Sequence, residues 1–245
     1  MPRTPKRPST RDRRDRRKTG AYAIVVAVIA VAAFLLMVKE QGLDGALRTL
    51  TGGEATGTAA GGESADAQEA RSTLESIPVA EPEPRGDYER DEFGSSWIDT
   101  DDNGCSTRND ILARDLADAE VRDDCKVVSG VLDDPYTGET IDFSSEDPQA
   151  VQIDHVVPLS LAWRMGASEW DRDTRVEFAN DPGNLLASDG PANMSKGDSG
   201  PGEWQPYDGF QCDYSLAYID VTDRYGLSLA QEDHDALGDM LDTCA

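Results

Sequence analysis

Apolar and polar positions divide the chain into three stretches of different character. Residues 21–38 form an uncharged, largely apolar run of 18 residues, at the lower end of the about 17–25 residues that a membrane-spanning helix needs. Residues 39–85 are rich in Gly, Ala, Thr, Glu and Pro and offer little to bury, as is typical of a disordered linker. All four tryptophans lie further on. Residues 86–245 are therefore predicted to form one folded domain with a single core.

The periphery of this domain is predicted to contain helices and a small hairpin. Residues 109–119 carry apolar side chains at helical spacing and predict an amphipathic helix. Residues 127–132 and 139–143 flank a turn-rich segment and predict the hairpin. Ser228 and Gln231 predict a capping-box start for the last helix. One face of that helix is apolar, made of Leu237, Met240, Leu241 and Cys244.

The centre of the domain shows a strand, an insertion, a second strand and a short helix. Residues 151–157 are rich in β-branched side chains and predict a buried strand that Pro158 ends. Residues 184–188 predict the second strand, and residues 189–197 a turn, a short helix and a glycine stop. Residues 159–178 lie between the two strands and are expected to form one or two short helices.

Charge is distributed unevenly along the chain and bears on its location. Residues 1–18 carry a net charge of +7 within a total of −25, so the remainder carries −32. Basic residues next to an apolar run stay in the cytoplasm. We therefore expect residues 1–20 to be a basic cytoplasmic tail and residues 21–38 a transmembrane signal anchor, with the domain outside at the cell membrane. A cleaved signal peptide, which would leave the domain secreted, stays open as the alternative.

The four cysteines all follow the apolar run, which agrees with export to an oxidising compartment. Four cysteines allow three pairings. The spacing favours Cys105–Cys125 and Cys212–Cys244, because each bond would close a local loop. A zinc site is the competing interpretation, but the chain contains no Cys-x-x-Cys pair. Disulfides are therefore predicted.

Chemistry-bearing residues accompany the two central strands and the helix after them. Asp154 and His155 stand near the end of the first strand, Asn184 opens the second, and Asn193 and Lys196 lie on the helix. This order resembles the ββα-metal core of HNH nucleases in their His-Asn-Asn form. Further residues extend the resemblance to secreted, membrane-anchored actinobacterial HNH proteins related to the DUF1524 or GmrSD C-terminal domain: Tyr88, Phe93, Gly94, Trp97, Asn103, Gly104, Cys105, Thr107, Arg108, Asn109, residues 134–138 and residues 179–181.

The resemblance, over about residues 86–245, implies an α+β fold and a role for each of these side chains. His155 would be the general base, and Asp154 and Asn193 would hold one divalent metal ion, Mg²⁺ or Mn²⁺. Asn184 would brace the loop that aims His155, and Lys196, one helical turn after Asn193, could face the same phosphate. Each residue also has a structural interpretation, a core histidine or an asparagine in a turn.

The implied activity is metal-dependent hydrolysis of phosphodiester bonds in DNA, with RNA left open. Because phosphate contacts need Lys and Arg, the acidic balance argues against tight, sequence-specific binding. Arg164, Arg172, Arg175 and Lys196 are expected to form a local basic rim around the motif. The expected partners are nucleic acid and, through the N-terminal helix, a membrane, with no obligate protein partner. His234, between two aspartates, is expected to be solvated.

A second metal site is suggested by an aspartate-rich turn. Asp99, Asp101, Asn103 and Asp110 follow the spacing of a calcium loop, although Asp replaces the usual closing Glu. A structural Ca²⁺ ion at this turn supports an alternative function, a non-catalytic surface binding module built on a nuclease-like fold. A phosphoesterase acting on small molecules is a third interpretation and differs from the nuclease only in substrate.

Overall fold

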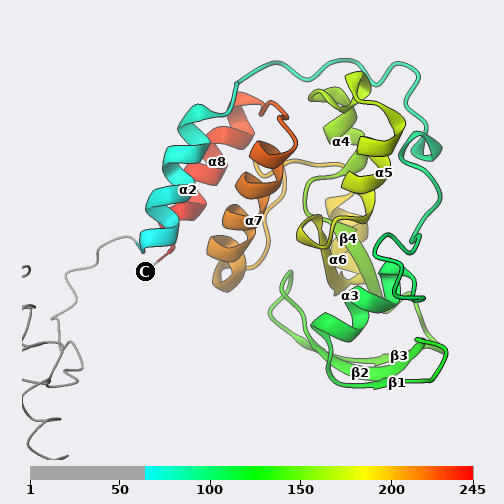
Figure 1. Cartoon of the computed structure of the whole chain (residues 1–245). Coiled ribbons are helices and arrows are strands. Elements are labelled where there is room, and N and C mark those ends of the chain that lie inside the picture. The colour runs from blue at the N-terminus through cyan, green and yellow to red at the C-terminus, as the bar shows by residue number, and fades with distance from the viewer. Residues whose placement is uncertain (1–63, 245) are drawn as a thin grey trace, which may run out of the picture. The chain divides into compact units, whose positions relative to one another are not determined.

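The computed structural model describes residues 64–244, which form a mixed α+β domain (Figure 1). The α+β class predicted from the sequence is confirmed. Its helices and strands are α2 (Ala65–Ser76), α3 (Thr107–Asp115), β1 (Ala117–Val121), β2 (Val127–Asp133), β3 (Thr140–Ser144), β4 (Val151–His155), α4 (Leu159–Arg164), α5 (Arg172–Asn180), β5 (Leu185–Asp189), α6 (Gly190–Lys196), α7 (Gln211–Arg224) and α8 (Gln231–Leu241). Short 3-10 helices, among them η1 (Arg90–Phe93) and η3 (Pro182–Asn184), join them.

The proposed cytoplasmic tail and membrane segment, residues 1–20 and 21–38, lie outside the described residues. Within residues 64–244, no helix is long and apolar enough to cross a bilayer.

The centre of the domain is the expected strand–strand–helix unit. β4 and β5 pair in antiparallel register, with Asp154 opposite Leu186 and His155 opposite Leu185. α6 follows β5 directly and ends at Gly197, whose φ of +57° is a conformation that glycine tolerates well. The insertion between the strands contains two short helices, α4 and α5. The predicted order of elements is confirmed, although β4 ends at His155 and not at Val157, and Asn184 is the last residue of η3, directly before β5.

Alternation along β4 sends neighbouring side chains to opposite faces. Val151 and Ile153 join a buried cluster with Ile111 and Leu112 of α3, so this face packs on the helix. Gln152 and Asp154 point away from that cluster and line a cavity. Ile153 and His155 also line this cavity, so the end of β4 contributes residues from both of its faces to the site.

A second, three-stranded sheet has the order β1-β2-β3. The predicted hairpin is confirmed as β2–β3. The helix predicted over residues 109–119 is partly wrong, because it ends at Asp115 and Ala117–Val121 pairs with β2 as strand β1. Leu116 fits the helical spacing of apolar residues but has an extended backbone. Pairing with β2 satisfies the backbone groups of β1, and this tertiary contact overrides the local pattern.

The predicted linker of residues 39–85 contains a helix within its described part. Ala67, Leu74 and Ile77 are buried, and α2 lies against α7 and α8 (Figure 1). Ser64 caps α2 through a hydrogen bond from the Ala67 N–H. The expected boundary at residue 86 therefore needs correction, since the folded region reaches back at least to residue 64. Only three apolar positions mark this face, too few to stand out in a polar segment.

The C-terminal helix shows one confirmed and one incorrect prediction. Leu237, Met240, Leu241 and Cys244 are buried as expected. The capping box is absent, because Ala230 is the N-cap of α8 and the Ser228 N–H donates to the Met165 carbonyl instead. Both predicted disulfides are present, Cys105–Cys125 and Cys212–Cys244. The second joins the start of α7 to the end of α8.

Candidate active site

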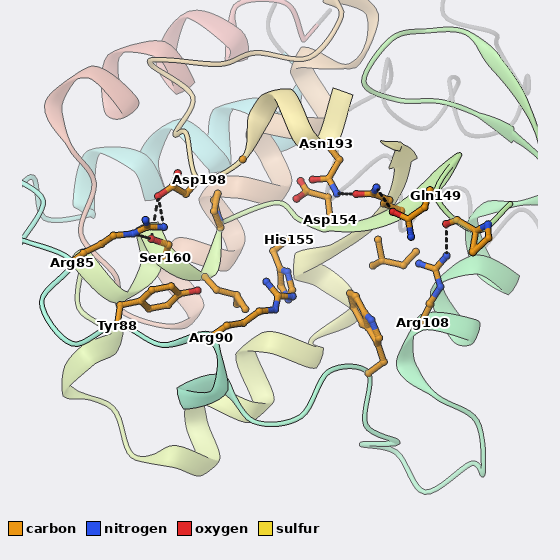
Figure 2. A pocket seen from close by; sticks show the side chains of 17 residues that line it. Arg85, Tyr88, Arg90, Arg108, Gln149, Asp154, His155, Ser160, Asn193 and Asp198 are labelled. Carbon is orange, nitrogen blue, oxygen red and sulfur yellow. Dashed lines mark hydrogen bonds and ion pairs between the residues drawn. The ribbon is translucent and has the colours of Figure 1, made fainter. Parts of the chain in front are cut away.

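A cavity of about 670 Å³ opens beside the strand–strand–helix unit and is shown in Figure 2. Asp154 and His155 of β4 and Asn193 of α6 line it. The fold thus brings to one surface three of the five side chains that the sequence singled out. The other two, Asn184 and Lys196, lie beneath this surface and are fully or almost fully buried.

His155 is held with one ring nitrogen bonded and the other open. Its Nε2 lies 2.9 Å from the Ala179 carbonyl oxygen, which can only accept, so Nε2 carries the proton. Its Nδ1 makes no hydrogen bond in residues 64–244 and is not among their buried unpaired atoms. Trp97 stacks on the imidazole, with 6.0 Å between ring centroids and 14° between planes. Burial lowers the pKa of His155 to about 4, so the ring is neutral at neutral pH and Nδ1 can accept a proton.

Asp154 uses one carboxylate oxygen for structure and leaves the other open. Its Oδ2 accepts hydrogen bonds from the Tyr136 hydroxyl at 2.6 Å and the Lys196 ammonium at 2.8 Å. Burial raises the pKa of Tyr136 well above its ordinary value, so this hydroxyl remains a donor. Oδ1 makes no hydrogen bond with the described part of the chain. The two donors therefore fix the carboxylate and leave Oδ1 available as a ligand.

Lys196 lies beneath the cavity and does not line it. Its side chain is fully buried, and its Nζ also donates to the His155 carbonyl at 2.8 Å. The sequence suggested that this ammonium could face a substrate phosphate. In the structure it contacts the backbone or carboxylate of both strand residues instead, which makes it a residue that positions them.

The two asparagines occupy different places. Asn184 is fully buried; its Oδ1 accepts from the Val157 N–H at 2.8 Å and its Nδ2 donates to the Val157 carbonyl at 3.3 Å. It thus braces the turn directly after His155. Asn193 donates through Nδ2 to Gln152 Oε1 at 2.9 Å, which leaves its own Oδ1 open.

The donor set at the cavity suits a hard divalent cation. Asp154 and Asn193 each offer one oxygen that makes no hydrogen bond within residues 64–244, and Mg²⁺ and Mn²⁺ prefer oxygen ligands. In this part of the chain no three His, Cys, Asp or Glu side chains are arranged to hold a metal. Mg²⁺ keeps several waters when few protein ligands bind it. A carboxylate and an amide oxygen are therefore sufficient protein ligands for such an ion.

The basic side chains at the cavity are not those expected from the sequence. Arg85, Arg90 and Arg108 line it, whereas Arg164 and Arg175 do not. Arg164 donates to the Glu83 carbonyl, and Arg175 pairs with Glu92; Arg172 also lies outside the lining. Closeness to the motif in sequence therefore did not predict which arginines line the cavity. The available signal was the interleaving of arginines with aromatic residues over residues 85–97.

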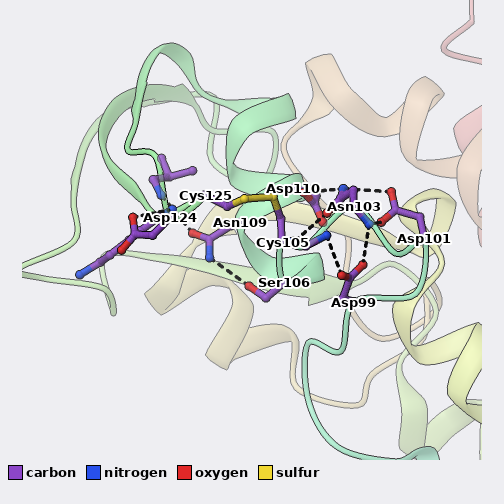
Figure 3. Close-up of a disulfide and its surroundings, with 12 residues drawn as sticks. Asp99, Asp101, Asn103, Cys105, Ser106, Asn109, Asp110, Asp124 and Cys125 are labelled. Atoms are coloured by element: carbon purple, nitrogen blue, oxygen red, sulfur yellow. Dashed lines mark hydrogen bonds between the residues drawn. A yellow bond between two sulfur atoms is a disulfide. The ribbon is translucent and has the colours of Figure 1, made fainter.

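The aspartate-rich turn is closed by its own hydrogen bonds (Figure 3). The Asp99 carboxylate accepts from the Asn103 and Gly104 N–H groups, and Asp101 accepts from Asn103. Asn103 Oδ1 in turn accepts from the Cys105 N–H at 2.7 Å. Several of the oxygens expected to bind calcium are thus bonded within the loop, and the calcium site stays a prediction.

A strand–strand–helix unit that presents histidine, aspartate and asparagine at one cavity is the arrangement of HNH-like nuclease domains. Residues 106–240 match the family model described as GmrSD restriction endonucleases, C-terminal domain. The chain belongs to this family. It is also 40% identical over 181 residues to an uncharacterized secreted protein of Arthroderma benhamiae, covering 73% of this chain and 86% of that protein. No solved structure matches the chain.

Proposed function

We propose that the chain is a metal-dependent endonuclease that hydrolyses phosphodiester bonds of DNA without sequence preference. One observation carries the proposal: His155 is anchored through Nε2 and presents Nδ1 to a cavity that Asp154 and Asn193 also line. Family membership supports the reaction class. The substrate is inferred from the chemistry that these groups can perform.

The chain's own residues supply a base and a rigid frame. His155 Nδ1 removes a proton from the attacking water, and the Nε2–H bond to Ala179 holds the ring in the required tautomer. Asp154 and Asn193 would hold the metal ion, which supplies Lewis-acid stabilisation of charge at the phosphate and the leaving oxygen. Asn184 and Lys196 keep the end of β4 in place. Cleavage would leave 5′-phosphate and 3′-hydroxyl ends.

We infer that the reaction takes place outside the cytoplasm. Two disulfides within the domain are typical of exported proteins, and the Arthroderma benhamiae relative is described as secreted. The apolar run of residues 21–38 would keep the domain at the cell membrane unless it is cleaved. Destruction or scavenging of foreign DNA suits that location better than repair.

Nicking of supercoiled plasmid by the full-length chain tests the activity, with Mg²⁺, Mn²⁺ or EDTA. We expect nicking with metal and none with EDTA. His155→Ala should lower the rate by about 10²–10⁴-fold, the usual contribution of a general base. His234→Ala is the matched control, because this histidine lies on α8 away from the cavity.

Nicking that survives in His155→Ala would contradict the assignment of the base. No nicking with any metal would contradict the enzyme. If Ca²⁺ then raised the melting temperature and Asp101→Ala abolished the effect, the calcium-stabilised binding module would replace it.

A further inference from the structure

The active-site cavity is basic although the protein is strongly acidic. The whole chain carries a formal charge of −25. Three arginines nevertheless line this one cavity, Arg85, Arg90 and Arg108, against two aspartates, Asp154 and Asp198. Lys and Arg provide the contacts to nucleic-acid phosphates. Favourable contacts with a polyanion are therefore concentrated at the cavity, and a wider footprint on the acidic surface would be repelled.

The three arginines are spread along the cavity (Figure 2). Arg85 lies at one end together with Tyr88, and Arg108 lies at the other end. His155 and Asp154 lie between them, with Arg90 beside the imidazole. A chain of phosphates crossing the catalytic residues would meet a guanidinium on each side.

Each guanidinium keeps donors for a further ligand. The Arg90 side chain makes no hydrogen bond or ion pair with any residue of the described region. Arg85 uses Nε for Ser160 and Nη2 for Asp198, and Arg108 uses Nη2 for two backbone carbonyls, those of residues 148 and 151. The remaining N–H groups of these two arginines have no partner in residues 64–244. The fold thus holds Arg85 and Arg108 in place without using all of their donors.

Two aromatic side chains, Tyr88 and Trp97, line the same cavity. Trp97 adopts a φ of +60°, which is unusual for a bulky residue and typical of positions that the surrounding structure constrains. Proteins that bind single-stranded nucleic acid combine a basic groove along the backbone with aromatic rings on which bases stack. Both parts are present here within one cavity, where Trp97 already stacks on the His155 imidazole and the Arg85 guanidinium lies over the Tyr88 ring, so a base would stack on the opposite face of either ring.

We propose that the cavity binds one unpaired polynucleotide strand, with the phosphates on either side of the scissile one at Arg85 and Arg108. This inference rests on the proposed nuclease function and names its substrate class. A cavity of 670 Å³ has the size of a pocket for a drug-sized ligand, so a short stretch of one strand fits it directly, whereas a duplex such as supercoiled plasmid must open locally for one strand to enter. Arg85 and Arg90 precede the family match at residues 106–240, so part of the strand contact comes from outside that match.

Fluorescence anisotropy of a labelled oligodeoxynucleotide tests the proposal, using the full-length chain in EDTA so that no cleavage is needed. We expect the single strand to bind about tenfold more tightly than the same strand annealed to its complement, because only unpaired bases can stack on the aromatic residues. Residues 1–18 are basic in every variant, so their contribution cancels between variants.

The dependence of binding on salt identifies the arginines. Each lost contact to a single-strand phosphate lowers the slope of log K against log salt by about 0.7. Arg85→Gln and Arg108→Gln should each show this loss, whereas Arg108→Lys keeps the charge and should keep the slope. Arg122→Gln is the matched control, because Arg122 is exposed, bonds Asp124 and lies outside the cavity.

Equal or tighter binding of the duplex would overturn the proposal, as would an unchanged slope in either glutamine variant. A melting temperature measured for each variant distinguishes lost contacts from lost folding, and Arg108→Lys retains a readout if Arg108→Gln unfolds. Because binding is measured without metal, it can succeed when plasmid nicking fails. The proposed nuclease activity and the proposed binding of a single strand can therefore be rejected separately.

Discussion

The strand–strand–helix unit and the segment upstream of it contribute to the same cavity in different ways. In β4, β5 and α6, the supporting side chains are buried and bonded, as with Lys196 beneath Asp154 and Asn184 beneath the turn after His155. Residues 77–97 contribute Arg85 and Arg90, whose side chains are exposed and form few bonds. The first region holds the proposed base and metal ligand in place through hydrogen bonds. The second places positive charge at the edge, or rim, of the cavity.

This difference indicates that the strand–strand–helix unit holds side chains in fixed positions, whereas residues 77–97 provide mobile contacts to phosphates. A base and a metal ligand must be held by side chains that cannot move, which requires burial and complete hydrogen bonding. Phosphate contacts along a flexible strand tolerate mobile arginines, because charge acts over several ångströms. Changes in the first region should therefore cost stability together with activity, and changes at the rim should affect mainly binding.

Removing the buried charge beneath the site should have the largest effect. Lys196→Met keeps most of the side chain's volume but leaves the Asp154 carboxylate without its ammonium partner. Loss of one member of a buried ion pair costs about 3–5 kcal/mol, so we expect a fall of that size in the free energy of unfolding, measured with urea. Lys126→Met, at an exposed position, should change it by less than about 0.5 kcal/mol. A small effect of Lys196→Met would mean that Asp154 does not need this charge.

Helix α2, which precedes residues 77–97, should also prove to be part of the fold. Leu74 is 2% exposed and belongs to the main apolar cluster. Leu74→Ala should lower the free energy of unfolding by about 2–5 kcal/mol, as other buried leucine truncations do. Val79→Ala, where the side chain is 46% exposed, serves as the control and should have little effect. Equal, small effects of both variants would mean that residues 64–76 do not contribute to the fold and act as a linker.

The burial of His155 should make stability depend on pH. The folded-state pKa of about 4 lies below the ordinary 6.5, so the unfolded chain binds a proton first as the pH falls. Neutral His155 therefore contributes fully to the free energy of unfolding above pH 6.5. As the pH falls from 6.5 towards 4, this free energy decreases by about 1.4 kcal/mol per pH unit, about 3 kcal/mol in all. Urea unfolding in EDTA at several pH values measures it, as the difference between the wild-type protein and His155→Gln. A flat difference for His155→Gln would contradict the prediction.

The sequence predicted the two regions with unequal success, and the reason is physical. Asp154, His155, Asn184 and Asn193 lie on or beside short elements whose strand and helix patterns are local, so the sequence predicted these elements, and the resemblance to HNH nucleases implied that the four side chains belong to one site. Arg85 and Arg108 reach the cavity from segments far from the motif in sequence, and only tertiary contacts such as the Glu83 N–H bond to Arg164 bring the first of them there. The sequence placed Lys196 on the correct helix. The spacing of residues along that helix did not show that its side chain is buried beneath the cavity, because burial depends on tertiary packing.

The smallest effect on stability, and the sharpest test of the comparison, is expected at Asp198. Its carboxylate accepts from Ser160 and pairs with Arg85 at 3.0 Å, with side chains 48% and 59% exposed. An exposed pair of this kind contributes about 0–1 kcal/mol, so Asp198→Asn should barely change the free energy of unfolding. The substitution also removes a negative charge from the cavity and releases Arg85 for phosphate, so single-strand affinity should rise by up to about fivefold, measured by anisotropy in EDTA.

Asp124→Asn is the control for Asp198→Asn, because Asp124 pairs with Arg122 outside the cavity. It should leave both quantities unchanged. A fall in single-strand affinity for Asp198→Asn would contradict the interpretation that Asp198 competes with phosphate for Arg85. Asp198 would then hold Arg85 in the orientation that phosphate binding needs, and the upstream segment would work by the same fixed geometry as the strand–strand–helix unit.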